Sequence, residues 1–206
     1  MIITVQTSSP DDRQIKKIVE ILRNDGVVII PTDTIYALIC NIYNHKAIER
    51  VCRLKNVKLE KSNFSFLFDN LSNISKFTRA FDRNIYKLLN RALPGPYTFI
   101  LEAGSEVPSI FRAKKKTIGI RIPDHRVVQK IISELGNPVM STSLHNDDEI
   151  TEYPVDPSEI YETYGNDVDC VVDGGHGNLI ASTVIDCTKG VPEIIREGAG
   201  DPSIID

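Results

Sequence analysis

The sequence predicts an α/β protein in which a twisted, mixed β-sheet carries helices on its faces. Short runs of β-branched residues alternate along the chain with segments whose apolar residues recur every three or four positions, as in amphipathic helices. No internal repeat, low-complexity tract or Pro/Gly-rich linker divides the 206 residues. Residues 1–206 are therefore expected to form a single domain.

The N-terminal part begins with a strand, a helix and a second strand. The first strand is expected over 2–5, and Asp11 or Asp12 can cap a helix that runs to about residue 24. The run Val27–Ile30 is apolar and β-branched at every position, which is typical of a strand buried on both faces. Pro31 ends this strand, because proline cannot donate a hydrogen bond to a central ladder.

The rest of the chain continues the alternation. Asn44 can cap a helix that extends through Leu54. Its predicted buried stripe consists of Ala47, Ile48, Val51 and Leu54. Further strands are expected over 64–68, 97–101, 117–122, 139–143, 169–173, 182–186 and 193–197, and further helices over 81–92 and 125–135. Gly136 ends the last of these helices.

Composition excludes several classes of protein. No apolar run approaches the roughly 20 residues that a membrane helix needs, and the N-terminus lacks the basic start and apolar stretch of a signal peptide. A cytoplasmic protein without a membrane partner is therefore expected. The four cysteines show no C-x-x-C spacing and are predicted to be buried, reduced thiols. His145 lies near Asp147 and Asp148, but such a polar loop is usually solvated, so no metal site is predicted from protein side chains.

Charge is distributed unevenly. Residues 1–144 carry 22 Lys and Arg against 13 Asp and Glu, whereas residues 145–206 carry 2 against 15, within a net charge of −4. Basic residues crowd the segments 46–61 and 112–116. This distribution favours an anionic ligand or a nucleic acid.

Small polar residues follow several of the predicted strands. Thr32, Asp33 and Thr34 come directly after a buried strand, and ligands of open α/β sheets bind at that end. The alternative is that these three residues only turn the chain and cap it. Other strand ends carry hydroxyl and guanidinium groups from Ser141, Ser143, Ser182, Thr183, Arg121 and Arg196. Together they indicate a site suited to an amino acid and phosphates.

Common signatures of other mechanisms are missing. The sequence contains neither G-x-x-x-x-G-K-[ST] nor G-x-G-x-x-G, and the Gly-rich segment 173–178 favours a turn over a phosphate cradle. No side chain pattern indicates a nucleophile with its base.

Eight segments, taken in order, resemble the YrdC/YciO family. They are PTDTIYAL, AIERVCRLK, PGPYTFIL, TIGIRIPDH, STS, VDCVVDGG, STVIDCT and REGAG, and they span about residues 10–200. The resemblance implies a YrdC-like open, twisted sheet with a large basic concave cavity. It also implies threonylcarbamoyl-AMP synthesis from L-threonine, bicarbonate and ATP with Mg²⁺, with release of pyrophosphate, as a step of tRNA threonylcarbamoyladenosine modification together with partner proteins.

The resemblance also implies which residues bind each substrate. Threonine would lie near Thr34, Thr98, Arg121, Ser143 and Ser182. The nucleotide phosphates would lie near Lys55, Lys58, Lys61, Ser141 and Arg196. Candidates for binding tRNA or double-stranded RNA are Arg50, Arg53, Lys114, Lys115 and Lys116.

Three positions depart from the synthase pattern. Ala37 replaces a glycine, Val57 an arginine and His145 an asparagine, which indicates the YciO-type branch of the family. Three hypotheses therefore stay open. The protein is a synthase or a close variant, an RNA-binding module with weak or no synthase activity, or a protein that binds a nucleotide or phosphorylated metabolite for regulation.

Overall fold

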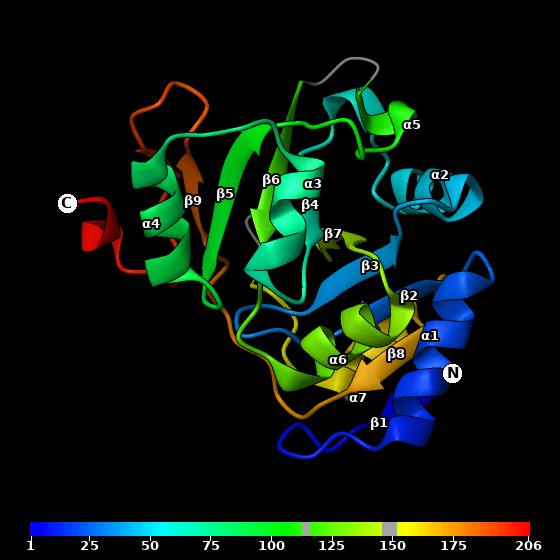
Figure 1. Ribbon diagram of the computed structural model, residues 1–206. Coiled ribbons are helices and arrows are strands. Elements are labelled where there is room, and N and C mark those ends of the chain that lie inside the picture. Colours follow the sequence, from blue (N-terminus) through cyan, green and yellow to red (C-terminus); the bar gives the residue numbers. More distant parts are fainter. Residues whose placement is uncertain (113–115, 146–151) are drawn as a thin grey trace.

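The computed structural model describes residues 1–112, 116–145 and 152–206, and these form one large sheet with helices on both faces (Figure 1). The strands are β1 (Ile2–Thr4), β2 (Val27–Ile30), β3 (Ala37–Asn41), β4 (Ser65–Leu67), β5 (Tyr97–Glu102), β6 (Thr117–Arg121), β7 (Val139–Ser143), β8 (Cys170–Asp173), β9 (Thr183–Asp186) and β10 (Glu193–Arg196). The helices are α1 (Asp12–Arg23), α2 (His45–Leu54), α3 (Ile74–Phe77), α4 (Arg83–Ala92), α5 (Ser109–Arg112), α6 (Arg126–Leu135) and α7 (Pro157–Tyr164), with short 3-10 turns at Leu59–Lys61, Leu71–Asn73 and Pro202–Ile205.

The sheet is mixed, as predicted. Its strand order is β1-β8-β2-β3-β7-β4-β6-β5-β9-β10. Strand β2 pairs in parallel with β8 and antiparallel with β3. All four residues of β2 are buried, and the strand stops before Pro31, in agreement with the sequence.

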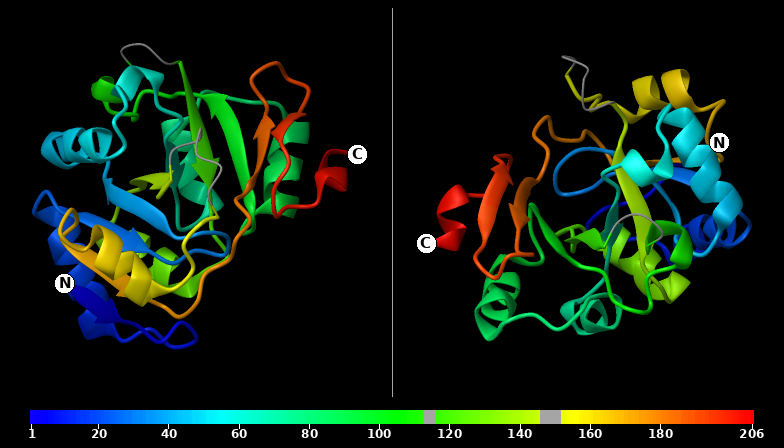
Figure 2. Two further views of the ribbon diagram at one scale, coloured as in Figure 1. Left: turned by 180° about the vertical axis from the view of Figure 1, so that it is seen from behind. Right: turned by 90° about the horizontal axis from the view of Figure 1, so that it is seen from above.

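Two apolar clusters lie on opposite faces of the sheet. Val28 and Ile30 of β2 pack in one cluster with the apolar stripes of α1 and α6, whereas Val27 and Ile29 belong to the other cluster with α2, α4 and α7. The alternation of side chains along a strand requires this division. In the rear view of Figure 2, α7 (yellow) and α2 (cyan) lie in front of the sheet, while α1 (blue) lies behind it.

Local signals explain where helices begin and end. The Asp11 carboxylate accepts a hydrogen bond of 2.7 Å from the backbone N–H of Arg13 and so caps α1. Gly136 ends α6 with a φ of 85°, in the left-handed region that favours glycine. Asn44 is the N-cap residue of α2, but its side chain does not cap the helix and donates instead to the carbonyl of Leu22 at 3.1 Å.

One predicted core position is wrong. Leu54 is 37% exposed, and Lys55 continues the buried stripe of α2 in its place. The reason is helical geometry, because the residue four positions after Val51 stays on the buried face at the end of the helix.

No helix in the described part of the chain is both long enough and apolar enough to cross a membrane. All four cysteines are free thiols; Cys40, Cys170 and Cys187 are buried, and Cys52 is half-buried.

The buried thiols predict a loss of stability in alkaline solution. Burial raises the pKa of Cys170 from 9.0 to about 11 and that of Cys187 from 9.0 to about 12. Burial also raises the pKa of Tyr36 from 10.0 to about 12. Because the folded pKa exceeds the unfolded one, this stability is complete below about pH 9 and is lost as the pH rises toward 12. Urea unfolding is expected to show a lower midpoint at about pH 10.5 than at about pH 8. Equal midpoints would contradict the prediction, and Cys187→Ala should reduce the difference.

Candidate functional site

The segment between β2 and β3 folds into a turn that its own threonine stabilises. Thr32 donates its hydroxyl to the carbonyl of Ile35 at 2.7 Å and accepts the backbone N–H of Thr34 at 3.1 Å. Thr34 is fully buried, and its hydroxyl accepts a hydrogen bond from a cation of a distant strand. Thr32 therefore turns the chain, as one of the two interpretations proposed, while Asp33 and Thr34 contribute to a polar site.

That cation is Arg121, the last residue of β6. Its guanidinium donates to the Thr34 hydroxyl at 2.6 Å and to the Thr32 hydroxyl at 3.4 Å. It also forms an ion pair with Asp33. The sequence placed Asp33 at the ligand-binding end of the strand but assigned it no substrate and no ion-pair partner.

The Asp33–Arg121 pair lies in a nearly dry environment. The exposed fractions of the side chains are 10% for Asp33 and 8% for Arg121. Burial lowers the pKa of Arg121, Asp33 opposes this effect, and Arg196 adds to it. Burial also lowers the pKa of His125, an effect that the charge of Asp33 opposes. The positive charge of Arg196 thus disfavours the charged form of Arg121, and a bound anion would offset this effect.

A second polar group joins three strands. The hydroxyls of Thr98, in β5, and Ser182, directly before β9, lie 2.8 Å apart in a buried hydrogen bond. Arg196, in β10, donates to the Ser182 carbonyl at 3.0 Å and is otherwise exposed. The structure thus brings Thr98, Ser182 and Arg196 together, next to the group around Arg121.

Small residues line one face of the sheet between these two polar groups. Ser65 of β4 pairs with Ser141 of β7 on one side and with Gly119 of β6 on the other. A Cβ atom on Gly119 would lie 3.2 Å from the Cβ of Ser65 and 3.3 Å from Cγ2 of Thr98. Arg121 lies two residues after Gly119 and so shares its face of the sheet. Glycine at position 119 therefore lets Ser65 and Thr98 approach closely on the face that also carries Arg121.

Lys55 and Ser143 lie at the carboxyl end of β7. The buried Lys55 donates its ammonium group to the carbonyl of Ser143 at 2.9 Å and also to the carbonyl of His145. The Ser143 hydroxyl donates to the same His145 carbonyl at 2.8 Å. These bonds fix the turn after β7 and hold a buried positive charge next to Ser143.

The Gly-rich segment 173–178 tethers the Thr32–Thr34 turn, a role that the sequence did not reveal. Asn178 donates its backbone N–H to the carbonyl of Thr34 at 3.1 Å and its side-chain amide to that of Asp33 at 3.1 Å. The Tyr36 hydroxyl donates to the carbonyl of Gly175 at 2.7 Å. A Cβ atom on Gly177 would lie 2.8 Å from the ring of Tyr36. Glycine is therefore needed for this close approach.

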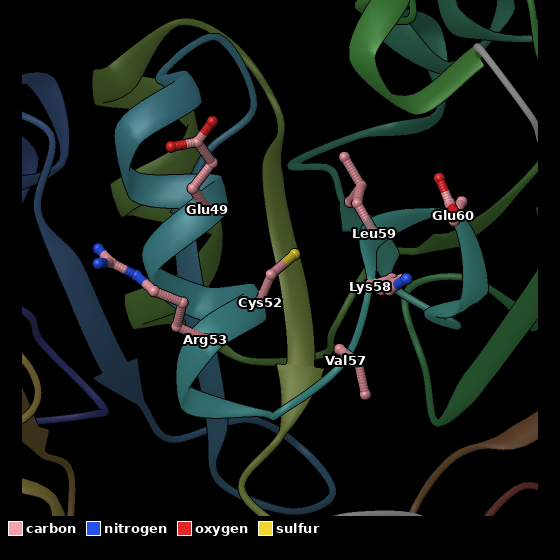
Figure 3. A pocket seen from close by; sticks show the side chains of 7 residues that line it. All are labelled: Glu49, Cys52, Arg53, Val57, Lys58, Leu59 and Glu60. Atoms are coloured by element: carbon pink, nitrogen blue, oxygen red, sulfur yellow. The ribbon is translucent and has the colours of Figure 1, made fainter.

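Lys58 and Val57 line a separate cavity of about 490 Å³, shown in Figure 3. Glu49, Cys52 and Arg53 of α2 form one wall, and the residues that follow the helix form the other. The cavity carries carboxylates as well as cations, so it is less suited to a triphosphate than the two-arginine face. Lys61 ends the 3-10 turn that follows α2, and its side chain is outside the part of the structure that is described. The roles of Lys58 and Lys61 as phosphate ligands therefore stay predictions.

The candidates for RNA contacts are dispersed. Arg50 is held in an ion pair of 2.6 Å with Asp169 and donates to the Asp167 carbonyl at 2.6 Å, which makes a phosphate contact less favourable. Arg53 and Lys116 are exposed. Lys114 and Lys115 lie outside the described residues. RNA binding stays a prediction.

Metal-binding groups are lacking in the part of the chain that the structure describes. Residues 1–112, 116–145 and 152–206 contain no group of three or more His, Cys, Asp or Glu side chains that could hold a metal ion.

Sequence comparison identifies a family for nearly the whole chain. The Sua5/YciO/YrdC family model, described as Telomere recombination, matches residues 20–198. The uncharacterized protein YciO of Escherichia coli K12 is 38% identical over 199 residues, which cover 96% of this chain and 95% of YciO. A threonylcarbamoyl-AMP synthase of Pyrococcus abyssi is 26% identical over 180 residues, covering 86% of this chain and 52% of the synthase.

Solved structures agree with the fold. The crystal structure of E. coli YciO superposes with a TM-score of 0.92 at 35% identity and covers 100% of this chain and 99% of YciO. P. abyssi Sua5 in complex with L-threonine superposes with a TM-score of 0.86 at 23% identity, over 96% of this chain and 57% of Sua5. The mixed α/β architecture predicted from the sequence is confirmed by both likenesses.

Proposed function

Because this chain belongs to the Sua5/YciO/YrdC family, we propose that it is an ATP-dependent enzyme that makes threonylcarbamoyl-AMP or a closely related acyl adenylate. One observation carries the proposal. The fold brings two guanidinium groups and several hydroxyls from distant parts of the sequence onto neighbouring strands and the β2–β3 turn; they belong to Thr34, Thr98, Arg121, Ser182 and Arg196. This set suits a small hydroxylated amino acid next to phosphates.

The reaction needs positioning more than covalent catalysis. L-Threonine and bicarbonate form a carbamate with loss of water, and a carbamate oxygen attacks the α-phosphorus of ATP while pyrophosphate leaves. Hydroxyls of Thr34 and Ser182 would bind the amino acid, and Arg196 would face the phosphates from an exposed position. Cations at fixed positions stabilise the charge that develops on the leaving group.

Support for threonine as substrate comes from relatives. A P. abyssi Sua5 has been crystallised with L-threonine, and more distant relatives are named threonylcarbamoyl-AMP synthases. Mg²⁺, when bound to the triphosphate, would neutralise part of its charge. Lys55, whose ammonium group lies against the end of β7, would contact the nucleotide phosphates, and Ser143, the last residue of β7, would contact the threonine.

The test is pyrophosphate release by the purified chain with ATP, Mg²⁺ and bicarbonate, measured with and without L-threonine. Threonine-dependent release is expected. Arg196→Ala should lower kcat/KM by about tenfold or more, because a charge-assisted contact to phosphate is lost. Lys55→Ala should also lower it, provided that circular dichroism shows a folded protein.

Arg79→Ala is the matched control, since Arg79 is 70% exposed in a surface ion pair with Glu102. It should leave the rate unchanged. Absence of threonine-dependent release from the wild-type chain would overturn the synthase proposal. Binding of double-stranded RNA that weakens steeply with added salt would then favour the RNA-binding alternative, whereas salt-insensitive ATP binding would favour a regulatory nucleotide site.

A further inference from the structure

A second cavity lies beside the end of β3, whereas the Thr32–Thr34 turn precedes the first residue of that strand. Its volume is about 300 Å³, a size typical of sites for small molecules. Residues that follow β3 and β4, the 3-10 turn and α3, the C-terminal residues of α6 and Glu106 line it. The described lining includes none of the residues that we assign to threonine or to the phosphates.

Hydrogen bonds fix two walls of this cavity. The side-chain carbonyl of the buried Asn41 accepts the backbone N–H of Tyr43 at 3.1 Å and the side-chain amide of Asn137 at 3.0 Å. On another wall, Asn73 donates its side-chain amide to the carboxylate of Asp69 at 3.3 Å. The cavity is therefore held open by the fold rather than by surface side chains alone.

The buried part of the lining is apolar. Phe68 is fully buried and Phe77 is nearly so, and their ring centroids lie 5.4 Å apart at an interplanar angle of 71°. Ile132 and Pro138 complete this part. Phenyl rings offer no ligands to a hydrated metal ion, whereas a methylene chain is stabilised by contact with them.

Two carboxylates from different walls carry negative charge into the cavity. Asp69 is half-buried and Glu106 is exposed, and neither forms an ion pair with a cation in the part of the chain that the structure describes. Burial raises the pKa of the Tyr43 phenol, and the charge of Glu106 adds to this effect, so Glu106 lies on the Tyr43 side. Carboxylates on separate walls favour a ligand with two separated cationic groups.

Lys76 also lines the cavity, and its charge gives a test of sign. Its ammonium group donates to the side-chain carbonyl of Asn73 at 3.4 Å, and the side chain is exposed. A lysine in this position repels a cationic ligand and attracts an anionic one.

An aliphatic diamine combines the features that this lining requires, two ammonium groups joined by an apolar chain. We propose that the cavity binds an aliphatic diamine or polyamine, with ammonium groups at Asp69 and Glu106 and the methylene chain against Phe68 and Phe77. This site is independent of the proposed function, so either proposal can fail without the other.

The experiment is isothermal titration calorimetry with 1,4-diaminobutane and three comparison solutes. They are 1-aminobutane, which lacks one ammonium group; 1,4-butanediol, which lacks both charges; and MgCl₂, whose cation has two charges and no methylene chain. All titrations use one ionic strength, because salt screens exposed charges. Saturable binding of diaminobutane is expected with a Kd below about 1 mM, at least about fivefold tighter than that of each comparison solute. Spermidine extends the series to a polyamine.

Variants of the lining locate the bound diamine. Asp69→Asn and Glu106→Gln should each weaken binding by about fivefold or more, because each removes one charge-assisted contact. Lys76→Met should strengthen binding by about threefold, since a like charge is lost. Glu162→Gln is the matched control, because it removes an exposed carboxylate of α7 that does not line the cavity. It should leave the affinity within about twofold of the wild-type value.

Each outcome decides the proposal. Absence of saturable binding for both diaminobutane and spermidine overturns it, as does equal affinity for Mg²⁺ and diaminobutane, which would indicate a general attraction of cations. Unchanged affinity in Glu106→Gln, an exposed position where the fold should tolerate the change, excludes this cavity even if Asp69→Asn does not fold. Weaker binding in Lys76→Met excludes it too. None of these results depends on threonine-dependent pyrophosphate release.

Discussion

Replacing Arg121 with methionine is expected to lower the free energy of unfolding by about 3 to 5 kcal/mol. The substitution keeps an unbranched apolar stem but removes the guanidinium, which leaves Asp33, whose side chain is only 10% exposed, without its counterion. An uncompensated buried carboxylate must either stay charged at high cost or take up a proton. Urea unfolding at neutral pH measures the change, and a loss below about 1 kcal/mol would contradict it.

Two further variants separate the ion pair from the loss of a long side chain. Arg79→Met removes a cation from a surface pair whose partners are 70% and 50% exposed, so it should cost less than about 1 kcal/mol. The double variant Asp33→Leu with Arg121→Met removes both charges. It should recover most of the stability lost in Arg121→Met, because no buried charge remains.

Gly119→Val is expected to lower threonine-dependent pyrophosphate release by about a hundredfold or more. The first added carbon would already lie 3.2 Å from the Cβ of Ser65 and 3.3 Å from Cγ2 of Thr98, and the two methyl groups would extend further over this face. Substrate could no longer approach Thr98 and Arg121 together. The stability of the fold should change by less than about 2 kcal/mol, because the sheet position itself favours a β-branched residue.

Thr117→Val is the matched control for this prediction. It places the same side chain two residues earlier on the same strand and the same face of the sheet, opposite Glu102. The rate should stay within about twofold of the wild-type rate. If Gly119→Val retained full activity, the face lined by Ser65, Gly119 and Thr98 would not be the substrate-binding surface.

Local sequence patterns predicted most of the secondary structure. The helix α1 has a capping aspartate and an apolar residue every three or four positions, and α6 has a similar stripe and a terminal glycine. These signals act within a few residues, so they do not need the tertiary fold. Strand β3 was missed, since a short apolar run after a turn gives no clear period and becomes a strand by pairing with β2 and β7. Helix α7 was missed although Asp156 caps it and Pro157 opens it.

Residue types in the site could also be predicted, but their connections could not. By itself, the sequence determined the α/β class, the strand that ends at Pro31 and a set of hydroxyl and guanidinium groups at strand ends. Only the tertiary structure decided that Arg121 pairs with Asp33, 88 residues away, that Asn178 tethers the turn, and that Ser65 and Thr98 approach Gly119 closely. The reason is physical, because strand register and ion pairing depend on side chains that the chain brings together from distant positions, whereas periodicity and capping depend on neighbours.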